Sequence, residues 1–232
     1  AIRRQRQMCI RDSNNMYIET KAAYAKEMVT AFIRLNGETV GAVANQPVDG
    51  ESVLTRNGLE KAERFIKFCD AFSIPLLTVT NVTGLRANAH EERKQALALA
   101  KFTTTLAQVS VPRINLIAGE AYGTAAEVMN SKAIGADFVL AWPQASVGMM
   151  DAEQAVRIMY AEEINTDKNK TALIAEKTAE YAEGQSSALA AAKRGYIDDI
   201  IEPDATRKRL IAAYEMLYGK KVTPVTKKHT AV

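Results

Sequence analysis

The stretch of sequence that decides the fold reads Ile114-Asn115-Leu116-Ile117-Ala118-Gly119-Glu120-Ala121-Tyr122-Gly123-Thr124-Ala125-Ala126. Its order predicts a buried strand over residues 114–118, a break at Gly119, a tight turn, and a helix over residues 123–134. The first amides of a helix have no acceptor inside the helix and favour negative charge in front of them. The same order of strand, glycine and helix is also common where the turn has no function. The rest of the chain must therefore show whether this turn is a functional site.

Strand and helix patterns alternate on both sides of this stretch. Two strand-like runs, residues 29–35 and 39–44, flank Asn36-Gly37, which is a strong hairpin signal. Asn57 with Glu60 predicts a helix start, and an apolar face then recurs at helical spacing. That face consists of Ala62, Phe65, Ile66, Cys69 and Phe72.

The remaining patterns complete an α/β domain. A buried strand is expected over residues 76–80, and short strands over residues 137–142, 145–148 and 197–201. Helices are expected over residues 91–109 and 203–218, and another from Asp151, with an apolar face of Ala152, Ala155, Val156 and Met159. Residues 162–183 are polar and highly charged, which favours a solvated helical excursion over a lid. No repeat or linker marks a second domain.

Composition limits the class of protein. The chain has 232 residues, of which 47% are hydrophobic and 25% charged, as in a soluble globular domain. No apolar stretch is long enough to span a membrane, and no charged-then-apolar leader pattern appears, so we do not expect secretion. Cys69 is the one cysteine of the predicted domain, so a buried thiol and a reducing, cytoplasmic compartment are expected.

The amino-terminal residues differ in character from the rest. Four arginines and one aspartate within residues 1–13 account for the whole net charge of +3, which leaves no basic face for nucleic acid. Residues 3–13 resemble the translation of a transposase-type sequencing adapter. We therefore expect residues 1–13 to be an artefact, residues 14–220 to form the domain, and residues 221–232 to be a basic tail. We also expect the chain to be a fragment of a longer gene product.

Several chemistries are not indicated. The two histidines, His90 and His229, have no triad partner by pattern, and no Cys/His spacing suits zinc. No phosphate-binding glycine loop is present, so ATP is not expected. No Met-Lys-Met motif occurs, so we expect no covalently bound cofactor. Backbone chemistry at the Gly123 turn remains.

Several motifs together resemble the C-terminal domain of biotin-dependent acyl-CoA carboxyltransferases, over residues 17–218 in order. The motifs are Gly41-Ala42-Val43-Ala44-Asn45-Gln46-Pro47, the helix at residues 61–72, Ala121-Tyr122-Gly123-Thr124-Ala125, Met129-Asn130-Ser131-Lys132 with Gly135-Ala136-Asp137 and Ala141-Trp142-Pro143, and Lys193-Arg194-Gly195-Tyr196-Ile197-Asp198. The resemblance implies a crotonase-like spiral of ββα units in a single domain. It also implies an active site shared with an N-terminal carboxyltransferase domain of another subunit, in a homo-oligomer.

The resemblance also assigns roles to residues. Two oxyanion holes act in the family, one on the acyl-CoA enolate and one on the ureido oxygen of biotin. The second is implied to use the turn at Gly123, with the amides of Thr124 and Ala125. Tyr122, Glu127, Thr83 and Gly84 are the implied substrate-binding positions, and no metal is implied.

This sequence departs from the family pattern at three of these positions. Thr124 replaces the second glycine of the family's "G-G", which keeps the amide but narrows the approach. Val82-Thr83-Gly84-Leu85 replaces "V-P-G-F" in a turn that lines the biotin pocket. Glu127 replaces an aspartate associated with acyl selection, and a solvated helix residue is an equal alternative there.

The expected function is carboxyl transfer between carboxybiotin, held on a separate biotin carboxyl carrier protein, and a short-chain acyl-CoA. Two alternatives stay open. The reaction could run backwards, as in the alpha subunit of a sodium-pumping malonyl- or methylmalonyl-CoA decarboxylase, or the chain could be an inactive fragment without its N-terminal domain. A crotonase isomerase or hydratase is disfavoured, because no pair of carboxylates marks the turn.

Overall fold

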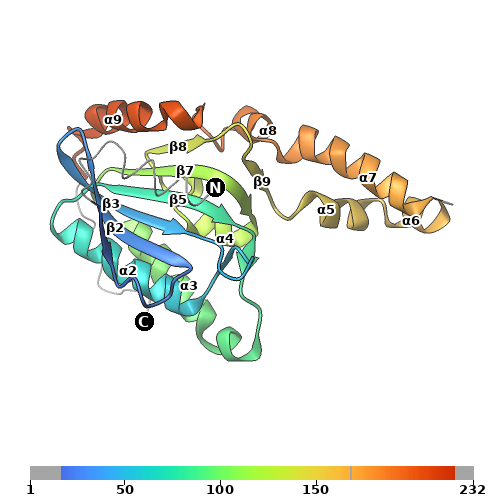
Figure 1. Cartoon of the computed structure of the whole chain (residues 1–232), viewed down its shortest axis with the longest axis horizontal. Coiled ribbons are helices and arrows are strands. Elements are labelled where there is room, and N and C mark those ends of the chain that lie inside the picture. The colour runs from blue at the N-terminus through green and yellow to red at the C-terminus, as the bar shows by residue number, and fades with distance from the viewer. Residues whose placement is uncertain (1–16, 168, 223–232) are drawn as a thin grey trace.

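The computed structural model describes residues 17–167 and 169–222 as a mixed sheet with helices on both faces (Figure 1). The predictions for residues 1–13 and for most of the tail at 221–232 therefore lie outside the described residues. The strands are β1 Ile18–Thr20, β2 Met28–Leu35, β3 Glu38–Asn45, β4 Val53–Leu54, β5 Leu76–Val82, β6 Gly84–Leu85, β7 Arg113–Tyr122, β8 Phe138–Ala141, β9 Ser146–Gly148 and β10 Asp199–Ile200.

Helices connect the strands and extend beyond them. The α-helices are α2 Arg56–Ala71, α3 Ala89–Gln108, α4 Gly123–Val128, α5 Ala152–Met159, α6 Ala161–Thr166, α7 Lys170–Tyr181, α8 Ala188–Lys193 and α9 Thr206–Leu217. The short 3-10 helices are η1 Lys132–Ile134 and η3 Pro203–Ala205, and η2 Ala182–Ser186 is a π-helix.

The sheet order is β1-β2-β3-β5-β7-β8-β10, and β9 also pairs with β7. The first three strands are antiparallel, whereas β3, β5, β7, β8 and β10 run parallel. Strand β7 pairs with β8 along its first half and with β9 along its last three residues. Strand β7 is therefore a central strand of the sheet, as expected for the stretch that leads into the Gly123 turn.

The predicted hairpin is confirmed. Strands β2 and β3 pair from Leu35↔Glu38 outward, and Asn36 and Gly37 both have positive φ, at 50° and 87°. A two-residue turn with both φ positive is the type that matches strand twist, which explains the Asn-Gly choice.

Each face of the sheet carries its own core. On one face α2 and α3 pack side by side, and on the other α9 lies across the strands (Figure 1). Cys69 is fully buried under the first face, and burial raises the pKa of its thiol to about 12. The prediction of a buried thiol is confirmed.

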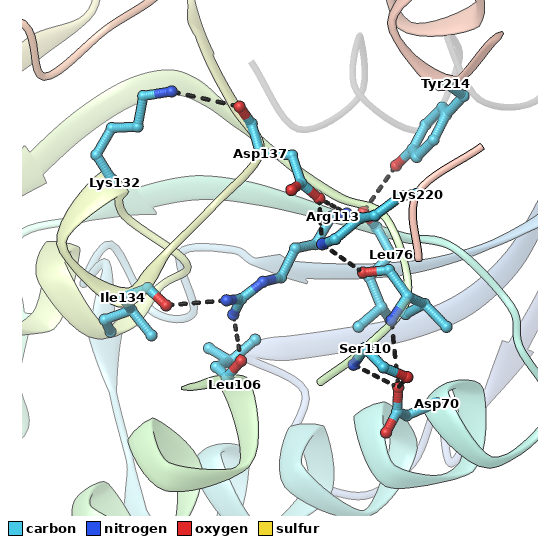
Figure 2. A network of polar contacts seen from close by, with 11 residues as sticks. Asp70, Leu76, Leu106, Ser110, Arg113, Lys132, Ile134, Asp137, Tyr214 and Lys220 are labelled. Atoms are coloured by element: carbon cyan, nitrogen blue, oxygen red, sulfur yellow. Dashed lines mark hydrogen bonds and ion pairs between the residues drawn. The ribbon is translucent and has the colours of Figure 1, made fainter. Parts of the chain in front are cut away.

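A buried polar network closes the amino-terminal edge of the parallel strands (Figure 2). Arg113, only 5% exposed, donates to the carbonyls of Leu106 and Ile134, the latter at 2.9 Å. Asp137 accepts from the backbone N–H of Arg113 at 2.9 Å and from Lys220 Nζ at 2.8 Å. Strands, helix ends and the last described residues are thus joined at this edge.

The helices α5, α6 and α7 project away from the body of the domain (Figure 1). No residue of α7 is buried, and Met159 is 64% exposed. The solvated helical excursion over residues 162–183 is confirmed, but Met159 does not belong to a buried face. Helix α5 is only about two turns long, and its last residue, Met159, lies beyond the buried core.

Four further sequence predictions are wrong in detail. Strand β7 continues through Gly119, and helix α4 ends at Val128 instead of residue 134. Thr55, not Asn57, caps α2, because its side chain accepts from the Gly58 N–H. Phe72 is 66% exposed, since it lies just past the last residue of that helix.

Candidate active site

The turn at Gly123 joins the end of β7 to the start of α4. Gly123 has φ +58°, a conformation that side-chain-bearing residues rarely adopt. A Cβ atom placed there would lie 3.0 Å from the backbone oxygen of Met149. Glycine is therefore favoured on two counts, the backbone conformation and the limited space beside the Met149 carbonyl.

Thr124 and Ala125 occupy the first turn of α4. The Thr124 side chain is exposed, whereas Ala125 is buried at 2% exposure. As the first amides of a helical turn, theirs lack acceptors within α4. The far end of α4 is held by the sheet, because Asn130, at φ 62°, donates to the Thr78 hydroxyl at 3.1 Å.

Tyr122 precedes the turn and points into the protein. It is 6% exposed, and its hydroxyl donates to Ser146 Oγ at 2.9 Å. Burial raises the pKa of this phenol, although the bond to Ser146 acts in the opposite direction. The contact seen here fastens β9 to β7, and contact of Tyr122 with substrate stays a prediction.

Glu127 lies on the exposed side of α4. Its carboxylate accepts from the Ser131 hydroxyl at 2.9 Å, one helical turn further on. This placement agrees with the alternative of a solvated helix residue, and its role in acyl selection stays a prediction.

The turn at Thr83 and Gly84 is brought beside α4. The backbone N–H of Thr83 donates to the Ser52 carbonyl at 2.7 Å, and Gly84 pairs with Val53 in the short β4–β6 ladder. Helix α4 packs against β6, so the two turns that the sequence places far apart are neighbours. Both lie at the carboxyl ends of parallel strands, where ligands bind in open α/β sheets.

A cleft of about 390 Å³ opens beside the Thr83 turn, and none of residues 121–127 lines it. Its size falls within the usual range for small-molecule sites. Thr83 is the predicted site residue that lines it, and Glu120 lines it from β7. The lining residues are Gly50, Glu51, Ser52, Val53, Thr83, Leu85, Arg86, Ala87 and Glu120.

Two asparagines near the site were not singled out by the sequence reasoning. Asn45 ends β3, and its Oδ1 accepts from the Asn81 backbone N–H at 2.8 Å. Asn81 lies near the end of β5, and its Oδ1 accepts from the Glu120 N–H at 3.0 Å. Polar residues at the ends of successive parallel strands were the signal that could have revealed them.

Within the described ranges, residues 17–167 and 169–222, no cluster of histidine, cysteine or acidic side chains is arranged to hold a metal ion. The helices in those ranges are all too short or too polar to cross a bilayer.

The fold and the site define the class of protein. The chain belongs to the carboxyl transferase domain family, whose model matches residues 4–232. The predicted crotonase-like fold is confirmed by solved relatives. A transcarboxylase 12S structure, with methylmalonyl-coenzyme A and methylmalonic acid bound, superimposes with a TM-score of 0.91 at 36% identity, over 97% of this chain and 44% of that one. The beta subunit of geranyl-CoA carboxylase from P. aeruginosa, at 22% identity and a TM-score of 0.74, shares the fold.

Several curated relatives are carboxylase, carboxyltransferase or decarboxylase subunits. A propionyl-CoA carboxylase beta chain from Roseobacter denitrificans is 40% identical over 94% of this chain and 42% of its own length. The methylmalonyl-CoA carboxyltransferase 12S subunit from Propionibacterium freudenreichii is 38% identical over 92% of this chain and 41% of its own length. The methylmalonyl-CoA decarboxylase subunit alpha from Propionigenium modestum is 38% identical over 93% of this chain and 42% of its own length. The chain thus spans about two fifths of the length of these relatives.

Proposed function

We propose that this chain supplies the carboxybiotin side of a carboxyltransferase site. The reaction moves a carboxyl group between carboxybiotin and a short-chain acyl-CoA of the acetyl, propionyl or methylmalonyl type. One observation carries the proposal: in a carboxyl transferase domain, the Gly123 turn places the first amides of α4 at the carboxyl edge of the sheet, beside the turn at Thr83 and Gly84.

The proposed chemistry needs donors where negative charge develops. When the N–CO2 bond of carboxybiotin breaks, CO2 leaves and charge collects on the ureido oxygen. The amides of Thr124 and Ala125 donate to that oxygen, and one such donor is typically worth about 3 kcal/mol of barrier. The ureido nitrogen then takes the α-proton of the acyl-CoA, and the resulting enolate adds to CO2 to form the new C–C bond.

The proposal implies several partners. Carboxybiotin arrives on a separate biotin carboxyl carrier protein, and acyl-CoA is bound mainly by an N-terminal carboxyltransferase domain of another subunit in a homo-oligomer. The cleft lined by Thr83 has a volume that suits a small-molecule ligand. The buried free thiol of Cys69 agrees with the cytoplasmic location that we propose.

A second direction of reaction has specific support. The decarboxylase subunit from Propionigenium modestum and the 12S carboxyltransferase subunit are both 38% identical to this chain. In the decarboxylase direction, a malonyl-type CoA would lose its carboxyl group to biotin. A neighbouring gene for biotin carboxylase would favour carboxylation, and one for a multi-span membrane subunit would favour decarboxylation.

A titration with biotin tests the assignment of the turn. In the ¹⁵N-labelled chain, biotin should shift the amide resonances of Thr124 and Ala125 more than those of the distant hairpin at Asn36 and Gly37. Thr124→Gly should tighten biotin binding, because the side chain that narrows the approach is removed. Equal shifts at the turn and at the hairpin would contradict the assignment.

An activity assay tests the half-site. Labelled carboxyl transfer from methylmalonyl-CoA to free biotin should be absent for the 232-residue chain alone. It should appear when a family N-terminal carboxyltransferase domain is supplied. Robust transfer by the chain alone would show that it is not half of a shared site.

A further inference from the structure

The pairing of β5 with β7 changes register just before the Gly123 turn. The strands pair in step from Leu76↔Arg113 to Thr80↔Ile117, and the next pair is Val82↔Ala121. Strand β7 therefore inserts two extra residues opposite β5. Such a bulge has no ladder partner of its own, so something else must set its shape.

Asn81 is the residue that faces this bulge. Its side-chain oxygen accepts from the Glu120 N–H at 3.0 Å, which satisfies a backbone group that the ladder leaves unpaired. Asn81 is in turn fixed by Asn45, which is 1% exposed. Asn45 accepts from the Asn81 N–H at 2.8 Å and donates to the Asn81 carbonyl. Two side-chain amides thus connect the ends of β3, β5 and β7.

Gly119 provides the space for this contact. A Cβ at residue 119 would lie 2.5 Å from Asn81 Oδ1 and 3.0 Å from its Cγ. Real Cβ atoms do not approach so closely, so any other residue would displace the Asn81 amide. Gly119 is therefore a glycine for lack of room, and this explains why the strand continues through it.

The bulge is three residues from Gly123. On the other side of the turn, a Cβ at residue 123 would lie 3.0 Å from the Met149 carbonyl oxygen, which leaves little room for a side chain there. The hydrogen bond at the bulge can therefore help to hold the amides of the turn within the roughly 0.5 Å that a working site requires.

From this geometry we infer that Asn81 is a positioning residue. Its side chain occupies the space that Gly119 leaves free, and it sets the position of the Gly123 turn and so of the Thr124 and Ala125 amides. The inference rests on the proposed function for its catalytic meaning. The arrangement of the turn can be measured without it.

The first experiment measures the turn itself. Asn81→Ala should speed amide exchange at Glu120 about tenfold, because one hydrogen bond is lost. It should also move the amide resonances of Gly123, Thr124 and Ala125. Asn81→Asp keeps the acceptor oxygen and should restore both readouts. The control Asn169→Ala removes a similar side-chain bond to a backbone amide on the projecting α7 and should leave the turn unchanged.

A double mutant tests the pair. Gly119→Ala alone should disturb the turn as Asn81→Ala does, because the new methyl group pushes the amide aside. In the combined variant the methyl group enters the space that Asn81 has left. Its effect should therefore be no larger than that of Asn81→Ala alone. Effects that simply add would contradict a shared mechanism.

Free biotin is the probe that separates this inference from the proposed function. Biotin affinity should fall about tenfold in Asn81→Ala and stay near the wild-type value in Asn81→Asp. Failure of the wild-type chain to respond to biotin would remove the proposed function and leave the exchange result to stand. Unchanged exchange and resonances at residues 120–125 in Asn81→Ala would overturn the positioning role, whatever biotin does.

Discussion

The two edges of the parallel sheet are built from different chemistry. At the amino-terminal edge, the buried Arg113 side chain donates to two backbone carbonyls, and Asp137 accepts from the Arg113 backbone N–H and pairs with Lys220 (Figure 2). At the carboxyl edge, the connecting groups are the neutral amides of Asn45 and Asn81, and the Thr124 side chain is exposed.

The amino-terminal edge therefore contributes to stability, whereas the carboxyl edge serves function. The buried guanidinium of Arg113 is held by two backbone carbonyls, although its Nε has no partner among the described residues, and these bonds favour a fixed arrangement of the amino-terminal edge. The amides of Asn45 and Asn81 position the backbone without adding a charge of their own. The carboxyl edge can thus leave donors available for a substrate on which negative charge develops.

Arg113→Met is the change with the largest expected effect on stability. It leaves the carbonyls of Leu106 and Ile134 without their buried donor. We expect a loss of about 3 kcal/mol in the free energy of unfolding, measured by urea denaturation. Biotin-induced shifts at Thr124 should persist in the folded fraction.

Arg93 on α3 provides the matched control, since its side chain is exposed. Arg93→Met should change the unfolding free energy by less than about 0.5 kcal/mol. A similar loss in both variants would mean that the amino-terminal edge has no special part in stability.

Gly123→Ala should have a smaller effect on stability and a larger one on the site. A positive φ and a contact with the Met149 carbonyl together cost about 1–2 kcal/mol. Gly37→Ala is the control, because its φ is also positive but nothing lies within 4 Å of the added Cβ. Both variants should lose stability in urea, but only Gly123→Ala should lose the biotin response at Thr124.

Local signals predicted the elements that local chemistry determines. The Asn36-Gly37 turn, the strand at Leu76 and the Asp151 cap of α5 needed no knowledge of distant residues. The Gly123 turn was also found from sequence, because a glycine between a strand and a helix signals a sharp turn.

The errors lie where distant residues decide. The sequence pattern predicts a strand break at Gly119, but this glycine leaves room for Asn81 on the neighbouring strand. Helix α4 was predicted too long, because Asn130 adopts positive φ and bonds to Thr78. Neither contact is visible in a one-dimensional pattern, since each depends on which strands become neighbours.

Lys220→Met tests the outer part of the amino-terminal edge. Lys220 Nζ lies 2.8 Å from Asp137, and their side chains are 18% and 17% exposed. Because Asp137 keeps its bond from the Arg113 N–H, we expect a loss of only about 1 kcal/mol. Lys177→Met is the control for a surface ion pair, because it removes the pair with the exposed Glu180 on the projecting helix α7. Equal unfolding free energies for the two variants would indicate that Lys220 belongs to the surface and not to the network.

The smallest expected effect on the free energy of unfolding appears at alkaline pH. It comes from Cys69, which lies in the core beside the amino-terminal edge. Burial raises the pKa of this thiol from 9.0 to about 12, so it stays protonated in the folded chain while the unfolded chain ionises. The stabilisation is therefore complete below pH 9 and is lost as pH rises towards 12. Between about pH 8 and about pH 9.5, the wild-type chain should lose somewhat less than about 1 kcal/mol more unfolding free energy than Cys69→Ala. Comparing the two slopes removes the contribution of Lys61, whose pKa burial lowers in both proteins. Parallel slopes would mean that solvent reaches the thiol, and that this end of the core is less tightly closed than the buried Cys69 and Arg113 side chains indicate.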